Sequence, residues 1–199
     1  VYKRQQQKGT ILENVVIKND TPDFNDNSLT ENTRASYSTN SIDDADKLGY
    51  VKKHPKNIIM LTCDAFGVLP PVMKLSPESA VEQFLLGYTA KVAGTEAGIS
   101  EPTATFSHCF GAPFMPLKPS EYGEILKAKI KKHNVNCWFV NTGWTGGPYG
   151  VGKRIPINIT RKIIDSIHNG NLAGSITFLH KPTGFAVPII EDVPRDMLR

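Results

Sequence analysis

The stretch N-I-I-M-L-T-C-D-A-F-G-V-L-P-P-V, residues 57–72, decides the fold of this chain. Ile58 to Leu61 form a short apolar run, which predicts a strand that is buried on both faces of a sheet. Asp64 follows the run, and a charged residue avoids full burial unless it is paired. Gly67 permits a tight backbone, and Pro70-Pro71 exclude both helix and ladder pairing. The strand thus places the Asp64 carboxylate at an edge of the sheet, where open α/β sheets bind ligands. The alternative is that Asp64 only caps the turn.

Strands alternate with helices along the rest of the chain, which predicts an α/β fold, a mixed sheet with flanking helices. Residues 11–17 and 135–140 are expected strands, and residues 25–40 are an expected polar loop. Ser76 is a typical N-cap for a helix that we expect Gly94 to end.

The composition narrows the class of protein. The chain has 199 residues, of which 40% are hydrophobic and 21% are charged, as in ordinary soluble globular proteins. It contains no apolar run near the ~20 residues that a membrane-spanning helix needs, so no membrane partner is expected. The net charge of +4 is modest and the lysines do not follow one groove. We therefore expect anionic small molecules as partners, and no nucleic acid.

The three cysteines, Cys63, Cys109 and Cys137, are odd in number, and none belongs to a C-x-x-C pair. A disulfide framework and a zinc site are therefore not expected, and a reducing, cytoplasmic compartment fits the sequence. Cys109 next to His108 suggests a nucleophile and its base, but adjacent residues rarely face each other. We predict that Cys109 is buried and inert.

A glycine-rich segment, G-P-Y-G-V-G-K at residues 147–153, has the spacing of a phosphate-binding P-loop. A P-loop needs Ser or Thr after its Lys to hold magnesium, and a helix that begins at once. Here Arg154 follows, and Pro156 biases Ile155 toward an extended backbone. We therefore reject the P-loop interpretation. The segment is predicted to be a flexible loop that presents Lys153 and Arg154 to an anion or nucleotide, without metal chelation.

Four segments together resemble one family, the ATP-dependent phosphoenolpyruvate carboxykinases. They are T-E-N-T-R at residues 30–34, D-A-F-G-V-L-P-P at 64–71, G-Y-T-A-K-V-A-G-T-E at 87–96, and the stretch from V-N-T-G-W to G-K-R-I at 140–155. They occur in the family's order and at similar spacing, and the resemblance covers roughly residues 11–172. It implies the C-terminal nucleotide-binding part of the carboxykinase fold. We expect a partial domain over residues 11–199, truncated at both ends, after a disordered or non-native extension over residues 1–10.

The resemblance also implies an activity. The family converts oxaloacetate and ATP to phosphoenolpyruvate, CO2 and ADP, a step of gluconeogenesis. It uses a divalent metal, Mn or Mg, and both the metal ligands and the family's P-loop lie outside the segment that this chain resembles. No metal ligand is therefore assigned here, and the isolated chain is expected to be inactive. A different class stays open, a nucleotide-binding module without catalysis of its own.

The resemblance further implies site residues. Arg34 falls on a family arginine that contacts the substrate and ATP phosphate, which makes it the candidate catalytic and substrate-binding residue. Arg154, Ile155 and Thr160 fall on the family's ATP site. The residues themselves also permit structural roles: Arg34 as a loop salt bridge, Arg154 as a solvated charge, and Thr160 or Asn158 as the cap of a helix that runs through His168.

Overall fold

The computed structural model describes residues 7–30, 32–43, 45–46, 51, 53–95, 98–191 and 193–198. The chain divides into two compact units. The smaller unit is Val1–Lys53 with Lys91–Glu101, and the larger unit is His54–Ala90 with Pro102–Arg199. Residues 1–6 of the expected N-terminal extension, and Glu31 and Glu96 of the family-like segments, lie outside the described residues.

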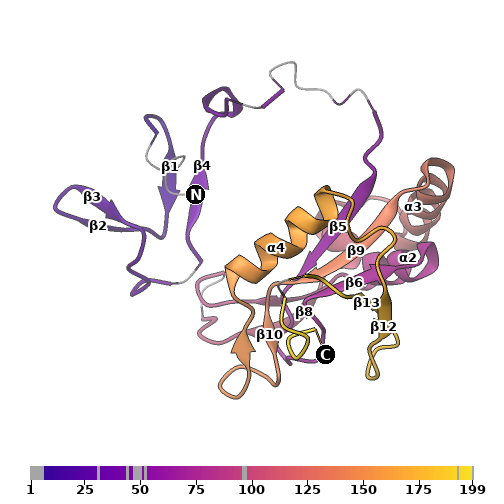
Figure 1. The fold of residues 1–199 in the computed structure, drawn as a ribbon. Coiled ribbons are helices and arrows are strands. Elements are labelled where there is room, and N and C mark those ends of the chain that lie inside the picture. Colours follow the sequence, from indigo (N-terminus) through magenta and orange to yellow (C-terminus); the bar gives the residue numbers. More distant parts are fainter. Residues whose placement is uncertain are drawn as a thin grey trace. The chain divides into compact units, whose positions relative to one another are not determined.

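A five-stranded mixed sheet forms the centre of the larger unit, in the order β12-β13-β6-β9-β5 (Figure 1). The strands are β5 (Asn57–Thr62), β6 (Val72–Leu75), β9 (Asn136–Asn141), β12 (Thr177–Leu179) and β13 (Ala186–Pro188). β5 and β9 are parallel, and the other neighbours are antiparallel. Thr62 lies opposite Asn141, so β5 and β9 end together at one edge of the sheet. The predicted mixed α/β class is confirmed.

The strand β5 exists as predicted, but the expectation that both of its faces are buried is wrong. Met60 is buried, whereas 56% of the surface of Leu61 is exposed. The physical reason is the position of β5, because it is the last strand of the sheet. The central strand β9, in contrast, is buried from Cys137 to Asn141.

The helix α2 (Pro77–Leu86) begins as predicted and ends earlier than predicted. The side chain of Ser76 caps its first turn by accepting a backbone N–H bond of 3.1 Å. The helix ends at Gly87, which has a φ of 57°, and not at Gly94. Only glycine fits there, because a Cβ on Gly87 would lie 1.8 Å from the carbonyl oxygen of Ser107. The chain then turns directly into the strand β7 (Tyr88–Lys91).

Two further helices pack in the larger unit (Figure 1): α3 (Pro119–His133), which packs against α2, and α4 (Ile157–His168). The helix α4 runs through His168 as predicted, but neither Asn158 nor Thr160 caps it. Pro156 occupies the N-cap position, with φ −63° and ψ 141° and no side-chain cap bond. Since the proline ring fixes its φ, the helix begins directly after it and Thr160 lies in the first turn. None of the helices in the described part of the chain is long and apolar enough to cross a membrane.

Short strand pairs complete the structure. They are β1 (Ile11–Glu13) with β4 (Arg34–Ser36), β2 (Val16–Lys18) with β3 (Thr21–Asp23), β7 (Tyr88–Lys91) with β8 (Thr103–Phe106), and β10 (Trp144–Thr145) with β11 (Lys153–Arg154). Short 3-10 turns occupy Thr39–Ser41, His108–Phe110 and Ala112–Phe114.

Two predictions fail in detail in the smaller unit. The single strand expected over residues 11–17 is divided into β1 and β2, because Asn14 takes a left-handed backbone with φ 58°. The expected loop over residues 25–40 contains β4, which pairs with β1 and places Arg34 opposite Glu13. Long-range pairing therefore overrides the polar composition of that segment.

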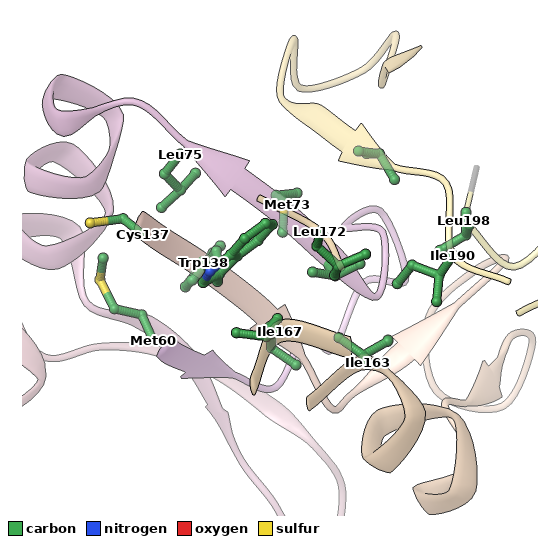
Figure 2. Packing of buried hydrophobic residues seen from close by; sticks show 14 of the residues in the cluster. Met60, Met73, Leu75, Cys137, Trp138, Ile163, Ile167, Leu172, Ile190 and Leu198 are labelled. Carbon is green, nitrogen blue, oxygen red and sulfur yellow. The ribbon is translucent and has the colours of Figure 1, made fainter. Parts of the chain in front are cut away.

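The hydrophobic core of the larger unit lies between the sheet and its helices (Figure 2). Trp138 and Met73 of the sheet and Ile163 and Ile167 of α4 are at most 1% exposed. The indole N–H of Trp138 donates a 3.1 Å hydrogen bond to the Asn57 side chain. The core thus fixes β9 and α4 on both sides of the segment that joins them, residues 142–156.

Candidate functional site

Asp64 organises the loop that follows β5. Its carboxylate is 1% exposed and accepts hydrogen bonds from three backbone N–H groups, those of Phe66 at 2.8 Å and of Val68 and Leu69 at 2.7 Å. The hydroxyl of Tyr88 donates a fourth bond of 2.7 Å. Burial, and then this bond to Asp64, raise the pKa of Tyr88. Both carboxylate oxygens are therefore used within the fold, and the interpretation of Asp64 as a turn cap is correct.

Asn141, at the end of β9, joins this loop to the next one. It is 0% exposed, and its side-chain oxygen accepts bonds from the backbone N–H of Asp64 at 3.0 Å and of Gly143 at 2.8 Å. Its side-chain nitrogen donates to the carbonyls of Leu69 at 2.9 Å and Trp144 at 3.1 Å. Asn141 was not among the residues predicted from the sequence. The signal was present, since a polar residue directly follows the apolar run of a buried strand.

The two loops are in close contact through glycines. A Cβ on Gly143 would lie 2.3 Å from the backbone nitrogen of Asp64, and a Cβ on Gly67 would lie 1.9 Å from the carbonyl oxygen of Gly147. Gly67 also has a φ of 68°, which side chains other than glycine rarely adopt. The D-A-F-G loop and the glycine-rich segment therefore form one packed unit at the edge of the sheet.

The glycine-rich segment is a β-hairpin rather than a P-loop. Lys153 lies in β11, opposite Thr145 of β10, and α4 begins only after Pro156. A P-loop needs a helix directly after its lysine, so the structure confirms that the P-loop interpretation was rightly rejected. The expectation of a flexible loop that presents Lys153 and Arg154 is corrected in part, because these two residues form β11 and pair with Trp144–Thr145 of β10.

Arg154 is exposed on this hairpin, next to an aromatic pair. Its guanidinium carbon lies 5.3 Å from the centre of the Trp144 ring, and its Nε donates to the carbonyl of Thr142 at 3.4 Å. Tyr149 meets the Trp144 ring edge-on, with a ring distance of 5.7 Å and an angle of 83°. The hairpin therefore holds a cation against an aromatic face, an arrangement suited to phosphate or to a planar base.

Ile155 and Thr160 lie close to Arg154 in the sequence but in different surroundings. Ile155 is 5% exposed and belongs to the hydrophobic core, and its N–H donates to Gly143 at 2.8 Å. Thr160 is half-buried in the first turn of α4, and its N–H donates to Pro156 at 3.2 Å. The side chain of Ile155 therefore stabilises the junction between hairpin and helix.

Arg34 belongs to the smaller unit, whereas the other three candidate residues belong to the larger unit. Its guanidinium is exposed and lies 3.4 Å from the carboxylate of Glu13, the residue opposite it in the β1–β4 pair. An exposed ion pair of this kind contributes only about 0–1 kcal/mol of stability. A stronger anionic partner is therefore able to displace Glu13 at low cost.

A cavity of about 820 Å³ borders the packed loops in the larger unit. Gly67, Val68, Gly146 and residues 178–182 line it. His180 is 6% exposed, its Nδ1 lies 2.9 Å from the Thr183 hydroxyl, and burial lowers its pKa. Burial therefore disfavours the protonated form of the His180 imidazole, which lines this cavity.

The remaining predicted features of the sequence have structural roles. Cys109 is buried as predicted, and burial raises the pKa of its thiol. The ring Nδ1 of His108 lies 3.0 Å from the carbonyl of Leu85, and His108 is exposed. Across the described residues, no group of three or more His, Cys, Asp or Glu side chains could hold a metal ion.

Comparison with known proteins identifies the family. The family model described as phosphoenolpyruvate carboxykinase matches residues 1–196, a wider range than the four segments cover. The phosphoenolpyruvate carboxykinase (ATP) of Agrobacterium fabrum is 56% identical over 193 residues, which are 96% of this chain and 36% of that protein. The enzymes of the same name from Brucella anthropi and Allorhizobium ampelinum are 57% and 55% identical, over 98% and 100% of this chain. The chain thus spans 36–37% of the length of these curated relatives, and it belongs to the family of ATP-dependent phosphoenolpyruvate carboxykinases.

Proposed function

We propose that this chain carries part of the ATP and substrate site of a phosphoenolpyruvate carboxykinase (ATP), which acts in gluconeogenesis. The reaction converts oxaloacetate and ATP to phosphoenolpyruvate, CO2 and ADP. The observation that supports this most is the exposed guanidinium of Arg154, held on the Trp144 ring at the end of a packed hairpin. It stands at the position where the family resemblance expects a nucleotide contact. The relatives compared above are all named as carboxykinases, so the binding-module alternative gains no support.

Each of the three candidate residues in the larger unit has its own role in nucleotide binding. Arg154 supplies a permanent planar cation for the phosphates or the base. Thr160 supplies a hydroxyl to the adenine edge. Ile155 contributes the position of its backbone, because its side chain is buried in the core and its N–H is already bonded.

Arg34 is the proposed catalytic and substrate-binding residue. During phosphoryl transfer, negative charge spreads over the transferred group, and cations stabilise that charge. The exposed guanidinium of Arg34 is suited to bridge a phosphate and a carboxylate once it leaves Glu13. In the full-length enzyme, Arg34→Lys keeps the charge and loses the planar fork, so turnover should fall about ten-fold or more. Unchanged turnover in that variant would remove Arg34 from the proposal.

The proposal includes ATP and a divalent metal as participants. Because the described residues contain no group of three or more His, Cys, Asp or Glu side chains that could hold a metal ion, no step is assigned to a metal on this chain. We place the protein in the cytoplasm, because its three cysteines are odd in number and none belongs to a C-x-x-C pair, which fits a reducing compartment.

The test is a chimeric enzyme in which this chain replaces the matching segment of the Agrobacterium fabrum relative, to which it is 56% identical. We expect carboxykinase activity from the chimera, and the isolated chain serves as the control that is predicted to be inactive. An inactive chimera that binds ATP would favour the binding-module alternative. A folded chimera with neither activity nor ATP binding would contradict the proposal.

Two matched variants of the chimera test the site. Arg154→Ala should raise the KM for ATP about ten-fold or more, in line with the loss of about 1.5–3 kcal/mol for a hydrogen bond to a charged group. The neighbouring Lys153→Ala should raise it less, and the KM for oxaloacetate should move less in both. If Lys153→Ala had the larger effect, the placement of Arg154 would be wrong.

A further inference from the structure

The ring of Trp144 contacts the guanidinium of Arg154, the arginine of the hairpin. In the β10–β11 pair, Trp144 is directly opposite Arg154, and the guanidinium carbon lies 5.3 Å from the ring centre. Arg154 Nε also donates a hydrogen bond of 3.4 Å to the Thr142 carbonyl, which restrains the guanidinium further. A cation over the face of an indole is attracted by the ring, and Trp is the most effective aromatic residue for this contact.

The Trp144 ring is itself held from several directions. Its backbone N–H donates to the Asp64 carbonyl at 2.8 Å, and its carbonyl accepts from Asn141 at 3.1 Å. The exposed Tyr149 packs edge-on against the ring at 5.7 Å. Because both loops of the site fix this residue, the ring presents a defined surface to Arg154.

Trp144 differs from the other tryptophan of the chain in its surroundings. It is 5% exposed, yet it does not belong to the core cluster that contains the other tryptophan, Trp138. The contact of its ring with the Arg154 guanidinium, within the same hairpin, asks for an explanation besides burial. Holding the guanidinium supplies one: a flexible arginine loses less freedom on binding an anion when it is already oriented.

We propose that Trp144 is a positioning residue for the nucleotide site, which orients the Arg154 guanidinium before ATP binds. This inference rests on the proposed function, in which Arg154 contacts ATP. Trp144 itself makes no contact with the nucleotide. Its effect on ATP affinity therefore passes through Arg154 and disappears when Arg154 is removed.

The first measurement is NMR spectroscopy on the complete chain. An indole ring shifts the resonances of protons that lie over its face, so the Arg154 Nε–H signal should be displaced from that of a solvated arginine. Trp144→Leu should return this signal to the solvated position, and Trp144→Phe should leave an intermediate shift. Trp138→Phe, which changes the other tryptophan, should leave the signal in place.

The second measurement is titration of the same samples with ATP, which NMR follows even for weak binding. We expect Trp144→Leu to weaken ATP binding about five-fold and Trp144→Phe about two-fold, within the range of cation–π contacts. Arg154→Ala should weaken binding about ten-fold or more. The double variant should bind ATP no more weakly than Arg154→Ala alone, within about two-fold, because the two residues act as one unit.

The outcomes separate this inference from the proposed function. If Arg154→Ala weakens ATP binding and Trp144→Leu does not, the inference is wrong and the proposed function stands. An undisplaced Arg154 signal in the parent chain would also overturn the inference alone. If ATP does not bind, or if Arg154→Ala has no effect, the proposed role of Arg154 fails and the inference fails with it. Trp144→Phe, which keeps an aromatic ring, decides the matter if the leucine variant does not fold.

Discussion

Replacement of Asp64 by Asn tests whether this carboxylate holds the edge of the sheet together. The side chain is 1% exposed and accepts four hydrogen bonds of 2.7–2.8 Å. Asparagine has the same shape but only one acceptor oxygen. If that oxygen faces the N–H groups of Val68 and Leu69, the amide nitrogen faces the N–H of Phe66, which cannot accept a bond. The hydroxyl of Tyr88 can turn and accept one.

The expected loss follows from these contacts. A hydrogen bond to a charged group contributes about 1.5–3 kcal/mol, and Asp64→Asn loses one such bond and weakens the others. The free energy of unfolding should therefore fall by about 2–4 kcal/mol. Asp64→Ala leaves four donors without an acceptor and should cost about 5 kcal/mol or more. Losses of this size are a large part of the free energy of unfolding of a folded domain, which is usually about 5–15 kcal/mol.

Urea denaturation followed by tryptophan fluorescence measures this loss in the right part of the molecule. The chain has 2 tryptophans, and both Trp138 and Trp144 lie in the larger unit. Glu124→Gln removes an exposed carboxylate from α3 and serves as the control, with an expected change within about 0.5 kcal/mol. If Asp64→Asn also stayed within that limit, the carboxylate would not be what holds the loop.

Two further predictions concern the packed loops and pH. Gly143→Ala should lower the free energy of unfolding by about 2 kcal/mol or more in the same urea assay, because its Cβ would meet backbone at 2.3 Å; a neutral effect would contradict the close packing. His133 stacks on His54 at 3.5 Å, and partial burial, then His54, Lys132 and Lys129 lower its pKa. Since unfolding restores the ordinary pKa of 6.5, the free energy of unfolding should fall as the pH drops below that value. Urea denaturation at stepped pH should show a less steep fall in His133→Gln. Parallel curves for the two proteins would refute this prediction.

Local features of the sequence predicted several elements correctly. The N-cap at Ser76 and the apolar run of β9 depend on a few neighbouring residues. The P-loop interpretation could be rejected for the same reason, because Arg154 and Pro156 act within the segment itself. In each case the deciding interaction spans only one turn or one strand, so the sequence contains the whole argument.

The predictions that failed or were missed depend on contacts between distant segments. Gly87 and not Gly94 ends α2, because the backbone near Ser107 comes too close for any side chain. Leu61 is exposed, because β5 lies at the edge of the sheet. No pattern of neighbouring residues carries this information, since the strand order is decided by packing.

The sequence by itself determined the family, the alternation of strands and helices, and the candidate residues Arg34, Arg154, Ile155 and Thr160. Only the tertiary structure decided what several residues do. It joins Asp64 to Asn141 across 77 positions of the chain. The reason is physical: a buried polar group must find its partners wherever the fold brings them, and those partners lie in segments that are distant in sequence.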